Sequence, residues 1–164
     1  KECGTASNMG KSRLMTDYSD SILYLAHVRG FTKHKSSGVA APGTFEGIVE
    51  KIPHLLDLGV TALELMPAYE FIELEETAKN DNELIDSYSN VEPKLNYWGY
   101  KSSYYFAPKA SYAAKGNKAT DSFKRMISEL HKAGIELIMQ FYFPNRHSIV
   151  EYLSHRIFPC HISI

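Results

Sequence analysis

The sequence predicts an α/β fold built on a parallel sheet, and three observations support this prediction. Short apolar segments typical of strands alternate with segments of helical spacing along the chain. One phrase occurs twice, as "LLDLGVTALELMP" and "LHKAGIELIMQFYFP": an amphipathic helix, a glycine, an apolar strand and a proline. The repeated strands are apolar on both faces, as in parallel sheets covered on each side. The order strand, helix, strand, helix, strand therefore favours parallel pairing.

The first predicted strand is "SILYLAHV", residues 21–28, a short apolar segment bounded by Gly30. A loop rich in serine, glycine and proline follows at 33–44. These features place one buried strand and an irregular connection before the first predicted helix.

Apolar residues recur at helical spacing from Phe45 to Leu56, which predicts the first helix. Thr44 is a candidate N-cap and Gly59 a candidate stop. Pro53 within the pattern is expected to kink this helix or to mark a short break. The segment "VTALELMP", residues 60–67, predicts the second strand.

The segment that follows is polar and acidic, and we expect a solvated insertion with some helix at about residues 70–94. A second helix is predicted with Thr120 as its cap and Gly134 as its end. The third predicted strand is "IELIMQFYF", 135–143, and a further helical pattern begins at 148–153.

Two architectures fit this order, a doubly wound sheet and a (β/α)8 barrel. A barrel of about 250 residues would be incomplete here.

The composition excludes several functional classes. The chain has 164 residues, a formal net charge of −1 and 44% hydrophobic residues, so a folded domain is expected. Scattered Lys and Arg argue against nucleic acid as a partner, and no apolar run is long enough for a membrane span. Cys3 and Cys160 lie at opposite ends and form no metal-binding spacing. With no signal-peptide core at the start, a cytoplasmic location is favoured, although a secreted parent is possible.

Aromatic rings with polar tips are concentrated in "LNYWGYKSSYYFAPKASYAA", residues 95–114. Ligands of α/β folds bind beyond the carboxyl ends of the strands, and this stretch follows the second predicted strand. Tyrosine and tryptophan offer an apolar face and a hydrogen-bonding tip, which matches a sugar ring. The same rings can instead pack a long loop onto the fold, and composition does not decide between the two.

Three segments, "LYLAHVRGFTKHKSSGVAAPGTFEGIVEKIPHLLDLGVTALELMPAYEF", "NYWGYKSSYYFAPKASYA" and "FKRMISELHKAGIELIM", together resemble the alpha-amylase superfamily (glycoside hydrolase family thirteen). The similarity is greatest to its pullulanase, isoamylase and glycogen-debranching branch and covers about residues 20–143. It implies a partial TIM (β/α)8 barrel, the first three β/α units, acting on an α-glucan such as glycogen, starch or a pullulan-like oligosaccharide.

The resemblance also implies site residues. Tyr100 is equivalent to a tyrosine that stacks on the sugar at the cleavage subsite, which makes it the leading substrate-binding candidate. The resemblance restricts the sugar-stacking prediction to Tyr100, and the aromatic residues after it in the sequence are expected to pack. Further substrate-binding candidates are the neighbours that support Tyr100 and two residues after the third strand: Asn96, Tyr97, Trp98, Asn145 and His147. The rings expected to pack are Tyr104, Tyr105, Phe106 and Tyr112.

The third strand departs from the family pattern. Where the family has an Asp that braces the site, this chain has Gln140, and Pro144 stands in place of an Asn linked to calcium. The Gln140 amide carries no charge, unlike the carboxylate that the family has at this position. Because the calcium-linked Asn is also replaced, no metal or other cofactor is expected.

No catalytic residue is assigned. Retaining glycosidases need two carboxyls about 5–5.5 Å apart, and the resemblance places these on fourth and fifth strands. Glu64 is interpreted as structural or as a barrel-interior residue, whereas Glu70 and Glu73 have no partner that the sequence identifies. Structural roles are expected for the three histidines that fall on predicted elements, which are His27, His54 and His131.

The sequence therefore predicts three regions. Residues 1–19 form a leader or linker, residues 20–153 the N-terminal part of a glycoside hydrolase catalytic domain, and residues 154–164 a truncated or divergent tail. Three functional hypotheses follow. The chain is part of an α-glucan debranching hydrolase and is inactive alone, it is a non-catalytic carbohydrate-binding or regulatory remnant, or it is an unstable fragment without function.

Overall fold

A computed structural model of the chain describes residues 16–75, 94–101 and 104–143. Its main sheet has three parallel strands in the order β1-β2-β7. These are β1 (Leu23–Ala26), β2 (Ala62–Leu65) and β7 (Glu136–Met139). The pairing has no register shift, since Leu23 lies opposite Ala62 and Ala62 opposite Glu136. This confirms the prediction of a mixed α/β fold with a parallel sheet.

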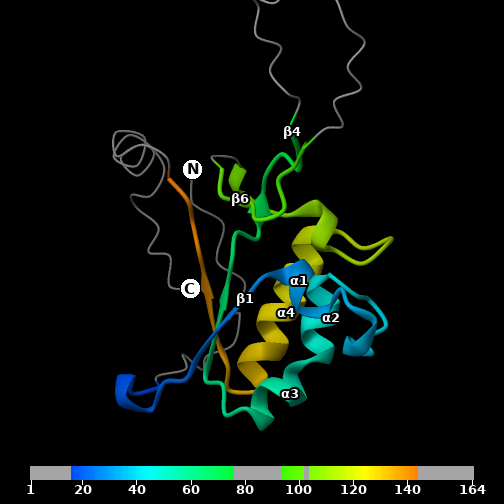
Figure 1. Ribbon diagram of the computed structural model, residues 1–164. Helices are drawn as coiled ribbons and strands as arrows, with labels where there is room; N and C mark the ends of the chain where they lie inside the picture. The colour runs from blue at the N-terminus through cyan, green and yellow to red at the C-terminus, as the bar shows by residue number, and fades with distance from the viewer. Residues whose placement is uncertain (1–15, 76–93, 102–103, 144–164) are drawn as a thin grey trace, which may run out of the picture.

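Four α-helices accompany the sheet among the described residues, and α2, α3 and α4 lie on one side of it (Figure 1). Three short 3-10 helices and four further strands complete the described elements. The helices are α1 (Val28–Thr32), α2 (Phe45–Glu50), α3 (Ile52–Asp57), α4 (Ala119–Lys132), η1 (Tyr18–Asp20), η2 (Lys35–Ser37) and η3 (Ala110–Tyr112). The further strands are β3 (Tyr69–Glu70), β4 (Leu74–Glu75), β5 (Lys94–Leu95) and β6 (Tyr104–Pro108).

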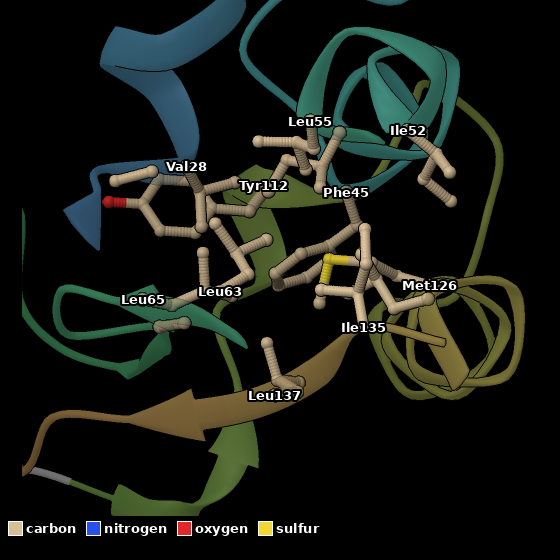
Figure 2. Close-up of a cluster of buried hydrophobic side chains, with 14 of the residues drawn as sticks. Val28, Phe45, Ile52, Leu55, Leu63, Leu65, Tyr112, Met126, Ile135 and Leu137 are labelled. Carbon is tan, nitrogen blue, oxygen red and sulfur yellow. The ribbon is translucent and has the colours of Figure 1, made fainter. Parts of the chain in front are cut away.

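The hydrophobic core lies between the sheet and this helical layer (Figure 2). Side chains from β2 and β7 meet those of α2, α3 and α4, and the buried ring of Tyr112 closes one end of the cluster. Fully buried members include Phe45, Leu63 and Met126. Each such side chain contributes about 1.5–3 kcal/mol when it leaves water, so this layer holds the sheet in place.

The opposite face of the sheet is open in the part of the chain that the structure describes. Leu23, Leu25 and Ile138 are each about half exposed there. Glu64 shares this face, because it lies in register with Leu25 and Ile138 and side chains alternate between faces along a strand. The expectation that both faces are covered is therefore met on one face of the described sheet.

The first helix is interrupted as Pro53 predicts. Helix α2 ends at Glu50 and α3 starts at Ile52, with Pro53 in the first turn of α3, where a missing N–H costs nothing. Thr44 caps α2, since its hydroxyl accepts a hydrogen bond from the Gly47 N–H at 3.2 Å.

Three local predictions are wrong. Gly30 does not bound the first strand, because it lies inside α1, which starts at Val28. Thr120 is not a cap, because α4 starts one residue earlier and its N-cap is Lys118, without a side-chain hydrogen bond. Strand β7 ends at Met139 rather than at residue 143.

The first part of the predicted insertion is only partly solvated, since Ile72 and Leu74 are exposed whereas Phe71 is buried. Tyr69 and Phe71 are buried, and β3 pairs with β6 as an antiparallel ribbon. A second ribbon joins β4 to β5.

The predicted helical pattern at 148–153 lies outside the described residues. Within the described ranges, none of the helices has the length and apolar character to cross a bilayer.

Candidate functional site

The three parallel strands end at one edge of the sheet, and the aromatic stretch lies beside that edge. Met66 N–H donates to Ala26 C=O and Gln140 N–H donates to Leu65 C=O, so the ladder continues just past the strands. His27 follows β1, and Gln140 follows β7. This edge is where α/β folds bind their ligands.

Tyr100 lies at this edge with its ring 44% exposed. Its hydroxyl donates to Gln140 Oε1 at 2.7 Å, and Gln140 Nε2 donates to Glu64 Oε1 at 2.6 Å. The Tyr142 ring meets the Tyr100 ring edge-on at 6.3 Å. A solvent-facing ring is thus tied at its polar tip to two strands, which leaves its apolar face available for a ligand.

Tyr97 packs against His27 rather than projecting alone. The two rings are stacked with centroids 4.4 Å apart, and Trp98 meets the His27 ring edge-on at 5.6 Å. Trp98 remains 53% exposed, so it shares with Tyr100 the character of a ring open to solvent. The structure therefore places Tyr97 as a support and Trp98 as an exposed ring.

His27 is held in one tautomer. Its Nδ1 accepts from the Gly30 N–H at 3.0 Å and caps α1, so Nε2 carries the proton. That Nε2–H donates to the Tyr97 carbonyl at 2.9 Å, with the Tyr112 hydroxyl at 3.2 Å. Burial lowers the pKa of His27, and the nearby Arg29 charge acts in the same direction. The interpretation of His27 as a structural histidine agrees with this fully bonded environment.

A hollow of about 290 Å³ opens between β1, α1 and the aromatic segment. Tyr24, His27, Phe31, Met66 and Trp98 are among the residues that line it. Its walls are mostly aromatic and apolar, with few polar atoms.

Asn96 shapes the backbone at the described site. Its Oδ1 accepts from the Gly99 N–H at 3.1 Å, which closes a tight turn. Gly99 has φ +77°, and a Cβ there would lie 2.5 Å from the Phe71 ring. Tyr69 adds a hydrogen bond from its hydroxyl to the Gly99 carbonyl at 3.2 Å. Asn96 thus orients the neighbouring rings through the turn.

An ion-pair network near the site was not expected from the sequence. Lys109, only 4% exposed, donates to Glu70 Oε1 at 2.5 Å and to the Phe71 carbonyl at 2.9 Å. Arg29 donates to Glu73 Oε1 at 2.9 Å. Glu70 and Glu73, which had no identified partner, are therefore both paired.

Electrostatics agree with this pairing. Burial opposes ionisation of Glu73, but hydrogen bonds from Ser111 and Arg29 and the charges of Lys109 and Arg29 outweigh it, so its pKa is lowered. The sequence shows an acidic run at 70–76 and lysines in and around the aromatic stretch, and neither marks Lys109 as the partner of Glu70.

Some rings of the aromatic stretch are buried and others are exposed to solvent. Tyr112 is buried, as expected of a packing residue, and Tyr105 is half-buried with its hydroxyl donating to the Tyr142 carbonyl at 2.9 Å. Tyr104 is 73% exposed, so the expectation that it packs is wrong, and Phe106 is 63% exposed. They lie on β6, whose ribbon pairing leaves alternate side chains facing outward.

A second aromatic group was missed because 141–143 was assigned to the third strand. Phe141 stacks on Tyr69 at 5.5 Å and on Phe143 at 6.2 Å, and Phe143 meets Tyr105 at 4.9 Å. These rings join the end of β7 to the β3–β6 ribbon. The other two predicted site residues, Asn145 and His147, lie outside the described residues.

The described ranges contain no cluster of three or more His, Cys, Asp or Glu side chains arranged to hold a metal ion.

The described geometry makes His27 sensitive to pH. The folded state favours its neutral form, so its contribution to stability is complete above the ordinary pKa of 6.5 and is lost as pH falls below that value. We expect the wild type to lose more free energy of unfolding between about pH 7.5 and about pH 5.5 than a His27→Asn variant, whose amide can still cap α1. Urea unfolding at the two pH values measures this, and equal losses in both proteins would contradict it.

Comparison with known proteins gives one consistent family. The family described as "Alpha amylase, catalytic domain" matches residues 16–154. Isoamylase 1, chloroplastic, of Arabidopsis thaliana is 39% identical over 137 residues, which cover 79% of this chain and 16% of the relative. Isoamylase of Pseudomonas amyloderamosa is 38% identical over 125 residues, covering 73% and 15%.

Solved structures agree. The pullulanase of Paenibacillus barengoltzii in complex with maltohexaose and alpha-cyclodextrin superposes with a TM-score of 0.58 at 29% identity. The match covers 76% of this chain and 20% of the pullulanase. The chain thus spans about a sixth of the length of these curated relatives.

Proposed function

Since the chain belongs to the alpha-amylase catalytic-domain family, in its isoamylase and pullulanase branch, we propose that it forms the first three β/α units of a (β/α)8 barrel in an α-glucan debranching hydrolase. In that barrel the open face carrying Leu25, Glu64 and Ile138 is the interior, which the side chains of further strands fill. The helical layer on the other face is the outer wall of the barrel.

The observation that carries the proposal is the placement of Tyr100. Its ring is exposed beside the carboxyl ends of β2 and β7, and its hydroxyl is fixed by Gln140. A fixed, half-exposed ring stacks on the apolar face of a glucose unit, while Trp98 offers a second such surface. The malto-oligosaccharide in the related pullulanase structure supports an α-glucan as the ligand.

The chemistry of cleavage is assigned to strands beyond these three. The carboxylates described near the edge are already engaged, with Glu64 bound by Gln140, Glu70 by Lys109 and Glu73 by Arg29. The resemblance places the two carboxyls that a retaining glycosidase needs on later strands. The 164-residue chain is therefore proposed to bind glucan without hydrolysing it.

The test of this proposal is affinity electrophoresis in gels containing glycogen. The wild-type chain is expected to be retarded, and Tyr100→Ala to lower the affinity about tenfold, the equivalent of ~1.4 kcal/mol from one ring contact. Tyr18→Ala is the matched control, because Tyr18 is an exposed tyrosine that precedes β1 at the opposite edge of the sheet. An unretarded wild type, or equal effects of the two variants, would contradict the proposal.

A second candidate function is a non-catalytic carbohydrate-binding remnant. The amide of Gln140, in place of the family's carboxylate, favours it. Joining the chain to the remaining strands of a related isoamylase separates the two. Release of reducing ends from glycogen by the fusion supports the hydrolase, and binding without release supports the remnant. Release by the chain alone, abolished by Tyr100→Ala, would overturn both.

A further inference from the structure

Two consecutive side-chain hydrogen bonds cross the apolar open face of the sheet, from Glu64 to Gln140 and from Gln140 to Tyr100. Glu64 and Gln140 share this face, because Glu64 pairs with Ile138 and Gln140 lies two residues further along. The Gln140 backbone is fixed as well, since its N–H donates to the Leu65 carbonyl at 2.9 Å. Both ends of the first link are therefore anchored to the central sheet.

The chemistry of the three side chains determines which group donates and which accepts in each of these hydrogen bonds. A carboxylate only accepts, so the Gln140 amide nitrogen must face Glu64, where it lies at 2.6 Å. The amide oxygen then faces Tyr100, whose hydroxyl must donate across 2.7 Å. An amide donates to one neighbour and accepts from the other without taking up a proton, as this position requires at neutral pH.

A carboxylate at position 140 would destabilise this set of hydrogen bonds at neutral pH. Two carboxylates at the distance now spanned by the Nε2–Oε1 bond cannot both be ionised, so one of them must take up a proton, and this costs free energy because both are ionised in the unfolded chain. Gln140 is thus matched to Glu64 in this protein, and a change toward the family's acidic residue would be harmful.

We infer that Gln140 is a positioning residue that fixes the Tyr100 ring by bridging it to Glu64, and that position 140 must be an amide while position 64 is a carboxylate. The glucan part of this inference rests on the proposed function, because it assigns Tyr100 to the sugar. The pairing itself does not.

A charge exchange across the bond tests the pairing. Gln140→Glu preserves the shape of the side chain and is expected to raise the unfolding constant about tenfold in urea titrations at neutral pH. The double variant E64Q/Q140E restores one amide and one carboxylate in exchanged places. It is expected to recover most of that loss, because the new amide donates to Glu at 140, which still accepts from Tyr100. A double variant no more stable than Q140E would overturn the inference, as would a harmless Q140E.

Glycogen-gel affinity measures the positioning role in the same variants. Q140E is expected to weaken retardation about fivefold, and the exchange variant to return it close to wild type, which a purely structural defect at residue 140 would not do. Recovery of stability without recovery of affinity would overturn the positioning role. An unretarded wild type refutes the proposed function alone, since the unfolding measurements then still decide the pairing.

Discussion

Replacing Lys109 with methionine is expected to lower the free energy of unfolding by about 1.5–3 kcal/mol, because the partly exposed Glu70 carboxylate and the Phe71 carbonyl lose a charged hydrogen-bond donor. The Lys109 ammonium is bonded to Glu70 and to the Phe71 carbonyl, and it lies 3.7 Å from Glu73. It also lies 4.7 Å from the centre of the Phe71 ring. Methionine keeps the length of the side chain but supplies no donor. Urea unfolding of the full chain measures the loss.

Two further variants separate burial from charge. Lys132→Met removes an exposed pair with Glu129, and should leave the free energy of unfolding nearly unchanged. The double variant E70Q/K109M leaves no uncompensated carboxylate at Glu70 and should be more stable than K109M alone. A loss for K109M as small as that for K132M would show that the network is not a buried one.

Replacing Gly99 with alanine is expected to cost about 2–5 kcal/mol, because two penalties coincide. At φ +77° an L-residue pays about 1–2 kcal/mol, and the added methyl would lie 2.5 Å from the Phe71 ring, an overpacking cost of about 1–3 kcal/mol. The turn that carries Tyr97, Trp98 and Tyr100 would shift, so glycogen retardation should fall together with stability. Urea unfolding and gel affinity measure the two effects.

Gly134 provides the matched control. Its φ is +79°, almost the same as that of Gly99, but a Cβ there would meet nothing within 4 Å. Gly134→Ala should therefore cost only the backbone part, about 1–2 kcal/mol. Equal losses at the two glycines would mean that Phe71 yields to the methyl group without cost.

The sequence predicted what depends on local pattern. The strands that became β1, β2 and β7 were recognisable as apolar runs, and the break near Pro53 and the cap at Thr44 follow from residue chemistry. Helix α4 was expected from its spacing, and Met126 and Leu130 are buried on the predicted face.

The sequence could not predict what depends on distant contacts. Lys109 and Glu70 are 39 positions apart, and nothing local marks them as partners. Likewise, α4 starts at Ala119 with Lys118 as its N-cap, although Thr120 is the residue in this segment that N-cap preferences select.

The candidate site was predicted in part. The resemblance selected Tyr100, and the structure gives its hydroxyl a partner in Gln140, a residue singled out only as a departure from the family. The link to Glu64 could not be inferred, since it requires knowing that both side chains point to the open face. Tyr104 and Phe106 are exposed because of the side of the β3–β6 ribbon on which they lie, and the number of aromatic residues in the stretch does not predict that side.

The parallel order of the sheet also sets a sequence of events during synthesis. Strand β2 is central but is made long before β7, which pairs with it. As the chain emerges at about 5–20 residues per second, β1 and β2 can associate while one edge of β2 waits for its neighbour. During that interval, unpaired backbone groups on β2 are available to other nascent chains. The period of greatest exposure to misassembly therefore ends only when α4 and β7 have left the ribosome.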